Sequence, residues 1–320
     1  MIKKSLLTLI GLASICNVQA GIVDKKGNIL PEVLNIVSMF NYELSENKTI
    51  NINALNSFVP EVFLRPADSE RYEEKAIQHY KKLCAPLSFD QKQSLLESFR
   101  RLGDIDSVYP VHQTYDYIAI QGATVPTMRH RLMFLVHLIE NDKIKIKANT
   151  KIIFLVGERA LYQSETSEVL LNPSPYEKDP KWQPPQTLPP DERQAARMIW
   201  AQLKLPKALR NTQPYFTNTS KQAGTSRAQT QDCIQDWLKT HHAEGRILMI
   251  SSNPYISYQE GVVNLAVAEA GFAEKVQVDP AGPGMSIDNQ DLDIVLGLAL
   301  DTLARTISIE KQRQNRLRMK

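Results

Sequence analysis

The side chains best suited to chemistry lie in three polar segments, each directly after a short apolar run. The first segment, Gln121-Gly122-Ala123-Thr124, leads into a helical pattern that carries Arg129 and Arg131. Gly122 permits a tight turn, and the first turn of a helix presents free N–H groups to anions. An arginine there can hold a phosphate or a carboxylate in bidentate fashion. The alternative is that both arginines lie on the solvated face of the helix.

The second segment is Gly157-Glu158-Arg159, and the third is Ser251-Ser252-Asn253-Pro254-Tyr255. Glu158 has the chemistry of a general base, a metal ligand or an ion-pair partner for Arg159. The hydroxyls and the amide of the third segment can bind a polar ligand, and Tyr255 can stack on it or donate a hydrogen bond. The alternative for the third segment is a plain turn, which its Asn-Pro pair marks.

Further polar residues stand at the predicted starts of two helices. Glu192 opens one helix, where the helix dipole stabilises a negative charge, and this explains the residue without a function. Arg227 and Thr230 open the next helix, and both can face the same crevice as the three polar segments. Glu158 and Glu192 are the acid/base candidates, and the other polar residues are candidate ligand contacts.

Several common catalytic motifs are missing from the sequence. It contains no GxxxxGK[ST] phosphate loop, no GxSxG elbow, no HExxH zinc motif and no complete GxGxxG dinucleotide fingerprint. It also lacks a CxxC pair and any metal-spaced set of cysteine and histidine. The sequence therefore predicts no metal site, and it names no cofactor.

Hydrophobic periodicity predicts a helical N-terminal region over residues 21–110. Its clearest helices are expected at 68–84 and 88–102, where apolar residues recur at helical spacing. Ser88 is a predicted N-cap that forms a capping box with Gln91. This region is expected to pack on the part of the chain that follows it.

The pattern then alternates between strands and helices over residues 111–309. Strands are predicted at 115–120, 151–156, 246–250 and 275–278, and the later helices at 228–241, 257–270 and 288–309. The predicted fold class is α/β, a Rossmann-like, doubly wound and mostly parallel sheet. Ligands of such sheets bind beyond the carboxyl ends of the strands, which is where the three polar segments lie.

Two loops and a tail interrupt this pattern. Residues 172–190 hold seven of the chain's 18 prolines, which excludes regular helix and central strand and predicts a long surface insertion. A second loop is predicted at 211–227. The basic residues 310–320 are predicted to form a frayed tail.

Residues 1–20 have the features of a cleavable signal peptide and predict export to a periplasmic or secreted address. A basic start precedes an apolar stretch, and Val18-Gln19-Ala20 offers small residues to a signal peptidase. One alternative is a buried N-terminal helix. Another is a lipoprotein anchored through Cys16, although Ile15 before it is too large for a good lipidation motif.

Charge and cysteine content narrow the possible partners. Cleavage after Ala20 removes two lysines and no acidic residue, so the formal charge falls from +3 to +1. A net charge this small does not indicate the basic surface that nucleic-acid-binding proteins use. No later stretch has the length of a membrane span. Cys84 and Cys233 can pair in an oxidising compartment, but two buried thiols are the preferred interpretation.

The order of these pieces resembles the ElyC/SanA/YdcF family of bacterial envelope proteins, a family of largely undefined activity. The resemblance covers about residues 115–265. The family pattern begins with a strand that ends in glycines and a helix that carries an Arg-Leu pair, which Gly122 and Arg131-Leu132 resemble. A second family strand ends in a glycine pair, and here Gly157 is followed by Glu158.

The later motifs of the family match only in part. Glu192 resembles the glutamate that opens the next family helix. Residues 227–232 keep an arginine-to-threonine spacing but carry Gln-Asp where the family has Glu-Asn. Residues 250–255 are similar to a strand end of the family, yet Ile256 stands where its histidine is expected. A family chemistry that depends on this histidine requires another residue in its place.

The resemblance implies a doubly wound α/β domain at the cell envelope with an anionic or nucleotide-like ligand. The leading hypothesis is an exported protein that binds a small phosphorylated or carboxylated metabolite, with hydrolysis or group transfer as the expected chemistry if it is an enzyme. The rival hypothesis is a non-enzymatic interaction scaffold, an exported effector included, whose partner is an envelope protein. The incomplete motifs favour the rival.

Overall fold

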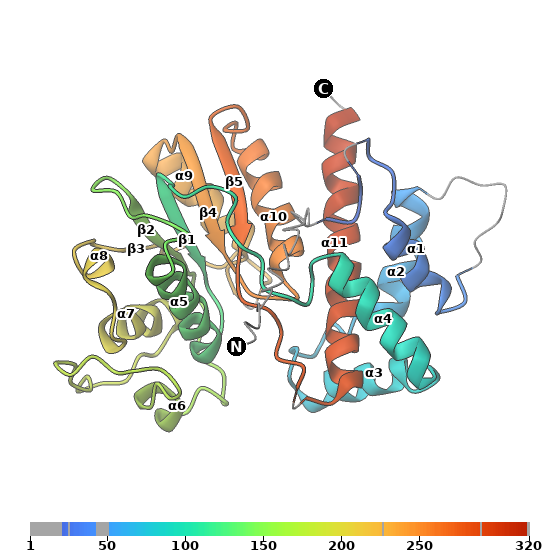
Figure 1. Ribbon diagram of the computed structural model, residues 1–320, viewed down its shortest axis with the longest axis horizontal. Coiled ribbons are helices and arrows are strands. Elements are labelled where there is room, and N and C mark those ends of the chain that lie inside the picture. Colours follow the sequence, from blue (N-terminus) through green and yellow to red (C-terminus); the bar gives the residue numbers. More distant parts are fainter. Residues whose placement is uncertain (1–20, 25, 43–50, 226, 289, 319–320) are drawn as a thin grey trace, which may run out of the picture.

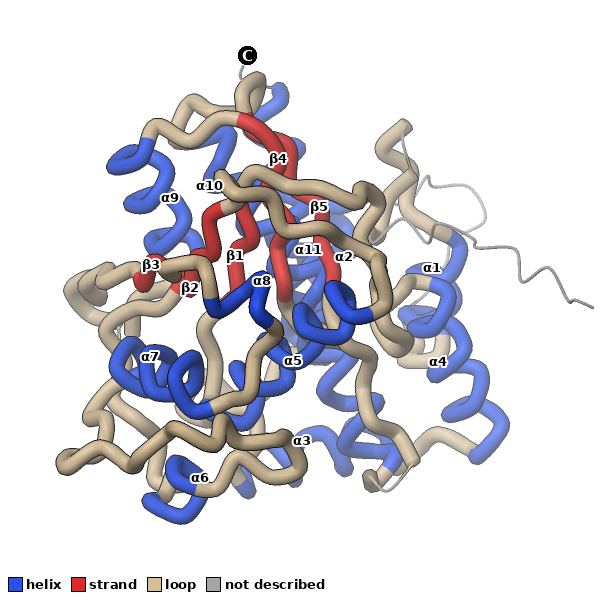
Figure 2. Tube along the Cα trace, turned by 60° about the vertical axis from the view of Figure 1, so that its left-hand side comes forward, coloured by secondary structure: helices blue, strands red, loops and turns tan. Residues whose placement is uncertain are grey.

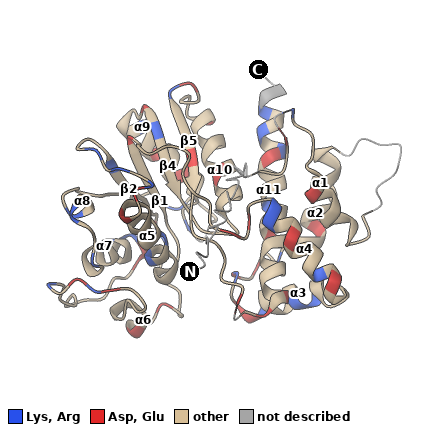
Figure 3. Ribbon diagram, in the orientation of Figure 1, with Lys and Arg blue, Asp and Glu red and all other residues tan. Residues whose placement is uncertain are grey.

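The computed structural model describes residues 21–318, except 25, 43–50, 226 and 289 (Figure 1). The predicted signal peptide, residues 1–20, lies outside the described residues. The described chain forms two lobes, an α/β lobe and a helical lobe. Lys and Arg positions are interspersed with Asp and Glu positions along both lobes (Figure 3).

The α/β lobe contains a five-stranded parallel sheet in the order β3-β2-β1-β4-β5. Its strands are β1 Tyr117–Gln121, β2 Lys151–Leu155, β3 Tyr215–Phe216, β4 Gly245–Ile250 and β5 Val276–Ala281. β1 is central, with Ile120 paired to Phe154 of β2 on one side and to Ile250 of β4 on the other. The predicted α/β, Rossmann-like fold is confirmed.

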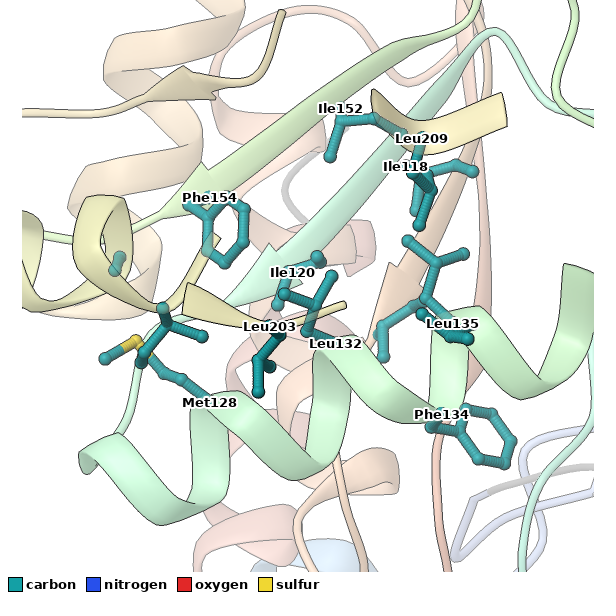
Figure 4. Packing of buried hydrophobic residues seen from close by; sticks show 14 of the residues in the cluster. Ile118, Ile120, Met128, Leu132, Phe134, Leu135, Ile152, Phe154, Leu203 and Leu209 are labelled. Atoms are coloured by element: carbon teal, nitrogen blue, oxygen red, sulfur yellow. The ribbon is translucent and has the colours of Figure 1, made fainter. Parts of the chain in front are cut away.

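Helices cover both faces of this sheet, because successive side chains of a buried parallel strand point to opposite faces. Ile118 and Ile120 pack on the face of α5 and α7, whereas Ala119 packs on the face of α9 and α10. Figure 2 shows the strands between these two helical layers. The layer of α5 is visible in Figure 4, where Leu132 lies against Ile120.

The helices of the α/β lobe follow the strands in chain order. The longer ones are α5 Val125–Glu140, α7 Glu192–Gln202, α9 Thr230–His241 and α10 Ile256–Glu269, and the short ones are α6 Ser167–Leu171 and α8 Lys207–Arg210. Asp191 caps α7 by accepting a hydrogen bond from the amide of Gln194 at 2.7 Å. This cap fixes Glu192 at the first position of its helix.

The helical lobe contains helices from the N-terminal and C-terminal parts of the described residues. It comprises α1 Pro31–Ser38, α2 Ile52–Phe63, α3 Glu74–Cys84, α4 Phe89–Arg101 and the long C-terminal helix α11 Leu292–Arg318. Leu296, Leu300, Leu303 and Ile307 of α11 recur at helical spacing and pack in one core with α1, α2 and α4. α11 also touches α10, so it connects the two lobes (Figure 1).

Several sequence predictions hold in the helical lobe and in the loops. Ser88 and Gln91 form the predicted capping box at the start of α4. Cys84 and Cys233 are both buried and free, which confirms the preferred interpretation. Residues 172–190 contain no helix and no strand of the sheet. Among the described residues, no helix is long and apolar enough to cross a membrane.

Three boundaries differ from the prediction. Residues 68–73 form turns instead of the first part of a helix; within these turns the carboxylate of Glu73 accepts the amide of Glu70 at 2.8 Å, and α3 begins at Glu74. β3 lies within the predicted loop 211–227, and its two residues are too few to show periodicity. The predicted frayed tail is helical through residue 318, since no helix breaker follows and Glu310 pairs with Arg313 at 2.7 Å.

Candidate functional site

The strand order reverses between β1 and β4, and this reversal is the topological switch point of the sheet. From β1 the chain moves outward through β2 and β3, and then returns to the other side of β1 for β4 and β5. The connections after β1 and β4 consequently lead to opposite faces, and ligands of such sheets bind at this point. We call the loops at residues 121–124, 157–159 and 251–253, with Arg131 and Glu192, the strand-end site.

Arg131 of α5 lies beneath the loops that follow β1 and β4. Its side chain is only 2 % exposed. Its Nη1 donates to the backbone oxygens of Gln121 at 2.8 Å and Gly122 at 3.0 Å. Its Nη2 donates to Oγ of Ser252 at 3.2 Å. One guanidinium thus joins the two loops of the switch point and brings together Arg131 and Ser252, which the sequence analysis predicted separately as ligand contacts.

Arg131 forms no ion pair with a described carboxylate, and the charge of Glu192, which favours the charged form of Arg131, compensates that charge only in part. Its hydrogen bonds go to carbonyls and a hydroxyl, and no described carboxylate lies within salt-bridge distance. Burial, and after it the positive charge of Arg71, lowers the pKa of Arg131 to about 10. A buried cation without a partner is costly, so this site favours an anion.

Arg71, from the turns before α3, is a residue that the sequence analysis did not single out. Its guanidinium carbon lies 4.0 Å from the centre of the Tyr255 ring, a cation–π contact. Its Nε is buried without a hydrogen-bond partner in the described structure. The hydroxyl of the neighbouring Tyr72 lies 3.4 Å from that of Tyr255. Tyr255 was predicted to stack on a ligand or to donate a hydrogen bond to it; in the structure Arg71 of the helical lobe lies over its ring.

Gln121 is the last residue of β1 and is fully buried. By strand alternation it shares a face with Ala119, the face that α9 and α10 cover. Neither its amide nitrogen nor its amide oxygen has a hydrogen-bond partner among the described residues. Buried amides are nearly always paired, so this pair of unused groups at a strand end indicates a polar contact that the chain alone does not supply.

Glu192 closes the side of the strand-end site near β2. Its Oε2 accepts the amide of Gly157 at 3.2 Å, and its Oε1 lies 3.4 Å from Nε of Arg159. A β-carbon on Gly122 would lie 2.9 Å from Oε1 of Glu192, so only glycine allows this approach. Burial raises the pKa of Glu192, although Arg159, the Gly157 amide and Arg227 favour its charged form.

Arg159 and Glu165 complete a buried ionic cluster with Glu192. Nη1 of Arg159 lies 2.8 Å from Oε2 of Glu165, whose Oε1 accepts the amide of Val125 at the start of α5. Two carboxyl groups thus share the guanidinium of Arg159. The sequence analysis missed Glu165, because eight residues separate Val156 at the strand end from the loop position of Glu165.

The remaining predicted residues are divided between the site and the scaffold. Gly157 packs against the segment that leads into α9, where an added β-carbon would lie 2.5 Å from Cβ of Ala228. Arg227 is partly buried, and its charge reaches Glu192. Thr230 is the first residue of α9 and is partly buried. Glu158 is exposed and accepts the amide of Lys221 at 3.2 Å.

Three predicted contacts are used by the protein itself. Arg129 is buried, and its guanidinium donates to backbone oxygens of residues 169–172 and to Gln202. Nδ2 of Asn253 donates to the backbone oxygen of Gly103 at 2.8 Å, which ties this loop to the helical lobe. Ser251 is bound through its hydroxyl to Oε1 of Gln259. These contacts position the strand-end loops.

A surface hollow of about 350 Å³ lies elsewhere, at the proline-rich insertion around Pro173, Pro175 and Tyr176. An adjoining hollow of about 300 Å³ is lined in part by Arg129, whose donors are already used. Arg129 is also a buried cation without a carboxylate partner among the described residues, but all its donors bind Gln202 and backbone oxygens. Arg131 keeps one Nη2 hydrogen unused, and this difference favours the strand-end site. No group of three or more metal-ligating side chains occurs among the described residues.

Comparisons with known proteins add no identification. No family model, no curated protein and no solved structure matches the chain.

Proposed function

We propose that this chain is an exported envelope protein that binds a small phosphorylated or carboxylated metabolite at the strand-end site. The observation that supports the proposal most strongly is Arg131, a buried guanidinium that joins both switch-point loops and has no carboxylate partner among the described residues. The unused amide of Gln121 adds polar capacity at the same strand ends. An anion here replaces the missing counter-charge.

Ligand binding should raise the thermal stability of the purified chain. A ligand at about a hundred times its dissociation constant adds roughly 2.7 kcal/mol, which is about 4 °C for a chain of this length. We expect such a shift with at least one of pyrophosphate, ADP, UDP-N-acetylglucosamine and citrate. Arg131→Met should abolish it because the variant lacks the unpaired cation.

Arg129→Met provides a matched control for this experiment. Arg129 is also a buried arginine of α5, but its donors bind the backbone of residues 169–172. The control should lose stability and keep the ligand shift. An equal shift in Arg131→Met and the unchanged protein, or no shift with any of the four compounds, contradicts the proposed site.

An acid/base role for Glu192 in hydrolysis or group transfer is a second candidate function. It is favoured by a buried carboxyl with a raised pKa, held against Gly122 and Gly157. If the chain hydrolyses p-nitrophenyl phosphate, Glu192→Gln should lower the rate about a hundredfold. Glu158→Gln is the matched control, because Glu158 is exposed and should leave the rate unchanged. Equal rates in both variants remove Glu192 from this role.

The proposed export rests on the sequence of residues 1–20 alone. Expression of the full chain in a Gram-negative host should yield a periplasmic product. Its measured mass should match a chain that begins at Gly21. A full-length product that stays in the cytoplasm contradicts this part of the proposal and leaves the ligand site untouched.

A further inference from the structure

Arg71 and Arg131 approach the same strand end from different lobes. Arg131 reaches Ser252 from α5, and Arg71 lies on the ring of Tyr255, three residues further along the chain. Tyr255 is 5 % exposed and packs with Tyr80 and Leu298 of the helical lobe. The turns before α3 therefore lie against the loop after β4, and Arg71 is part of this contact.

Neither guanidinium lies within salt-bridge distance of a carboxylate among the residues that the structure describes, although the charges of Asp301 and Glu192 favour the charged forms of Arg71 and Arg131, respectively, from further away. Neighbouring arginines differ in this respect: Arg65 pairs with Asp301 at 2.7 Å, and Arg159 pairs with Glu165 at 2.8 Å. Arg71 retains a buried Nε without a hydrogen bond. The positive charge of Arg71 also lowers the pKa of Arg131, second only to burial, as expected for two cations close together.

We propose that Arg71 and Arg131 bind one phosphate monoester between the two lobes, so that the ligand of the strand-end site is a dianion. This inference rests on the proposed function and names its ligand class. Two unpaired cations are matched by the charge of a phosphate monoester, about −1.5 to −2 at neutral pH. A single carboxylate leaves one of the two cations uncompensated.

The geometry of the donors supports a phosphoryl group as well. Arg71, whose Nε has no hydrogen bond, can bind two phosphoryl oxygens in parallel, whereas Arg131 already donates to two carbonyls and Ser252 and has one Nη2 hydrogen left for a third oxygen. The hydroxyl of Ser252 beside Arg131 and those of Tyr72 and Tyr255 beside Arg71 are further hydrogen-bond donors. Arg71 acts here as a specificity residue, since it distinguishes a dianion from a monoanion.

Calorimetric titration of the full chain with phenyl phosphate and with methyl phenyl phosphate tests this inference. The two probes share their aromatic group and differ in charge. The unchanged protein should bind phenyl phosphate at least tenfold more tightly. Arg71→Met should weaken the binding of phenyl phosphate ten- to hundredfold and largely remove this preference. Arg71→Lys keeps the charge but loses the planar guanidinium group. Its affinity for phenyl phosphate should lie between those of the unchanged protein and Arg71→Met.

Lys75→Met is the control, because it removes one positive charge nearby from an exposed side chain that pairs with Asp68. Its affinities should stay within about twofold of the unchanged protein. If Arg131→Met abolishes binding and Arg71→Met does not, the anion site stands and the two-arginine inference is overturned. If the unchanged protein binds neither this pair of probes nor the earlier panel, the proposed function itself fails.

Discussion

Asparagine at position 104 should stabilise the protein at pH 8 by at most about 4 kcal/mol. Asp104 is 6 % exposed, and burial raises its pKa to about 7. Its carboxylate accepts a hydrogen bond from Oγ of Ser257 at 2.7 Å and has no cationic partner among the described residues. Asparagine keeps an oxygen for Ser257 and removes the buried charge.

The pH dependence of this effect has a definite sign. In the unfolded chain the carboxyl of Asp104 loses its proton near pH 4, and in the folded chain near pH 7. The folded state thus holds the proton more tightly, and its stability is full below pH 4 and declines as the pH rises through 7. Asp104→Asn removes this decline, so its advantage should shrink to about 1–2 kcal/mol at pH 5.

Urea unfolding at pH 5 and pH 8 measures the free energy of unfolding of the unchanged protein and of Asp104→Asn at each pH. Asp106→Asn is the control, because Asp106 is exposed and pairs with Arg100 at the surface. It should change the free energy of unfolding by less than about 0.5 kcal/mol at either pH. Glu260, whose pKa burial also raises to about 7, contributes equally in every variant. An Asp104→Asn protein that is less stable at pH 8 shows that the charge is compensated.

Alanine at position 297 should destabilise the protein by about 3 kcal/mol. A β-carbon on Gly297 of α11 would lie 2.3 Å from Cβ and 2.8 Å from Cα of Tyr80 in α3. Tyr80 is fully buried, and a backbone atom cannot yield without a shift of the whole helix. The overpacking exceeds the gain of about 1 kcal/mol that alanine brings to a helix interior.

Gly261→Ala in α10 is the matched control for this change. A β-carbon there would lie 2.9 Å from Cγ2 of Ile309, the end of a side chain that can rotate. Its free energy of unfolding should stay within about 1 kcal/mol of the unchanged protein. Equal stability of the two variants would contradict the close packing of α11 on Tyr80 of α3.

Much of the strand-end site could be predicted because it follows directly from strand pattern and topology. Gly122, Gly157 and Ser252 come immediately after buried strands, and parallel strands bring their carboxyl ends to one edge. The sequence analysis treats Arg129 and Arg131 alike as candidate anion ligands. Side chains two residues apart on a helix, however, point in directions about 200° apart. They therefore face different surroundings, and the sequence did not show which one faces the site.

The contribution of the helical lobe could not be predicted from the sequence. Arg71 and Tyr72 lie about 180 residues before Tyr255, and no local pattern links them. Both residues also lie within the predicted helix 68–84. The structure has turns at this position, and these turns bring Arg71 to Tyr255. The long helix α11 joined the core of α1, α2 and α4 through contacts that only the folded chain reveals.

Hydrogen exchange of the full chain with and without saturating pyrophosphate tests the central claim most directly. The strand-end site predicts slower exchange of the backbone amides at 121–124 and 251–253, where Arg131 joins the two loops. The amides at 173–178, which line the hollow of the proline-rich insertion, should not change. Protection at 173–178 alone, or no protection anywhere, would contradict an anion site at the switch point.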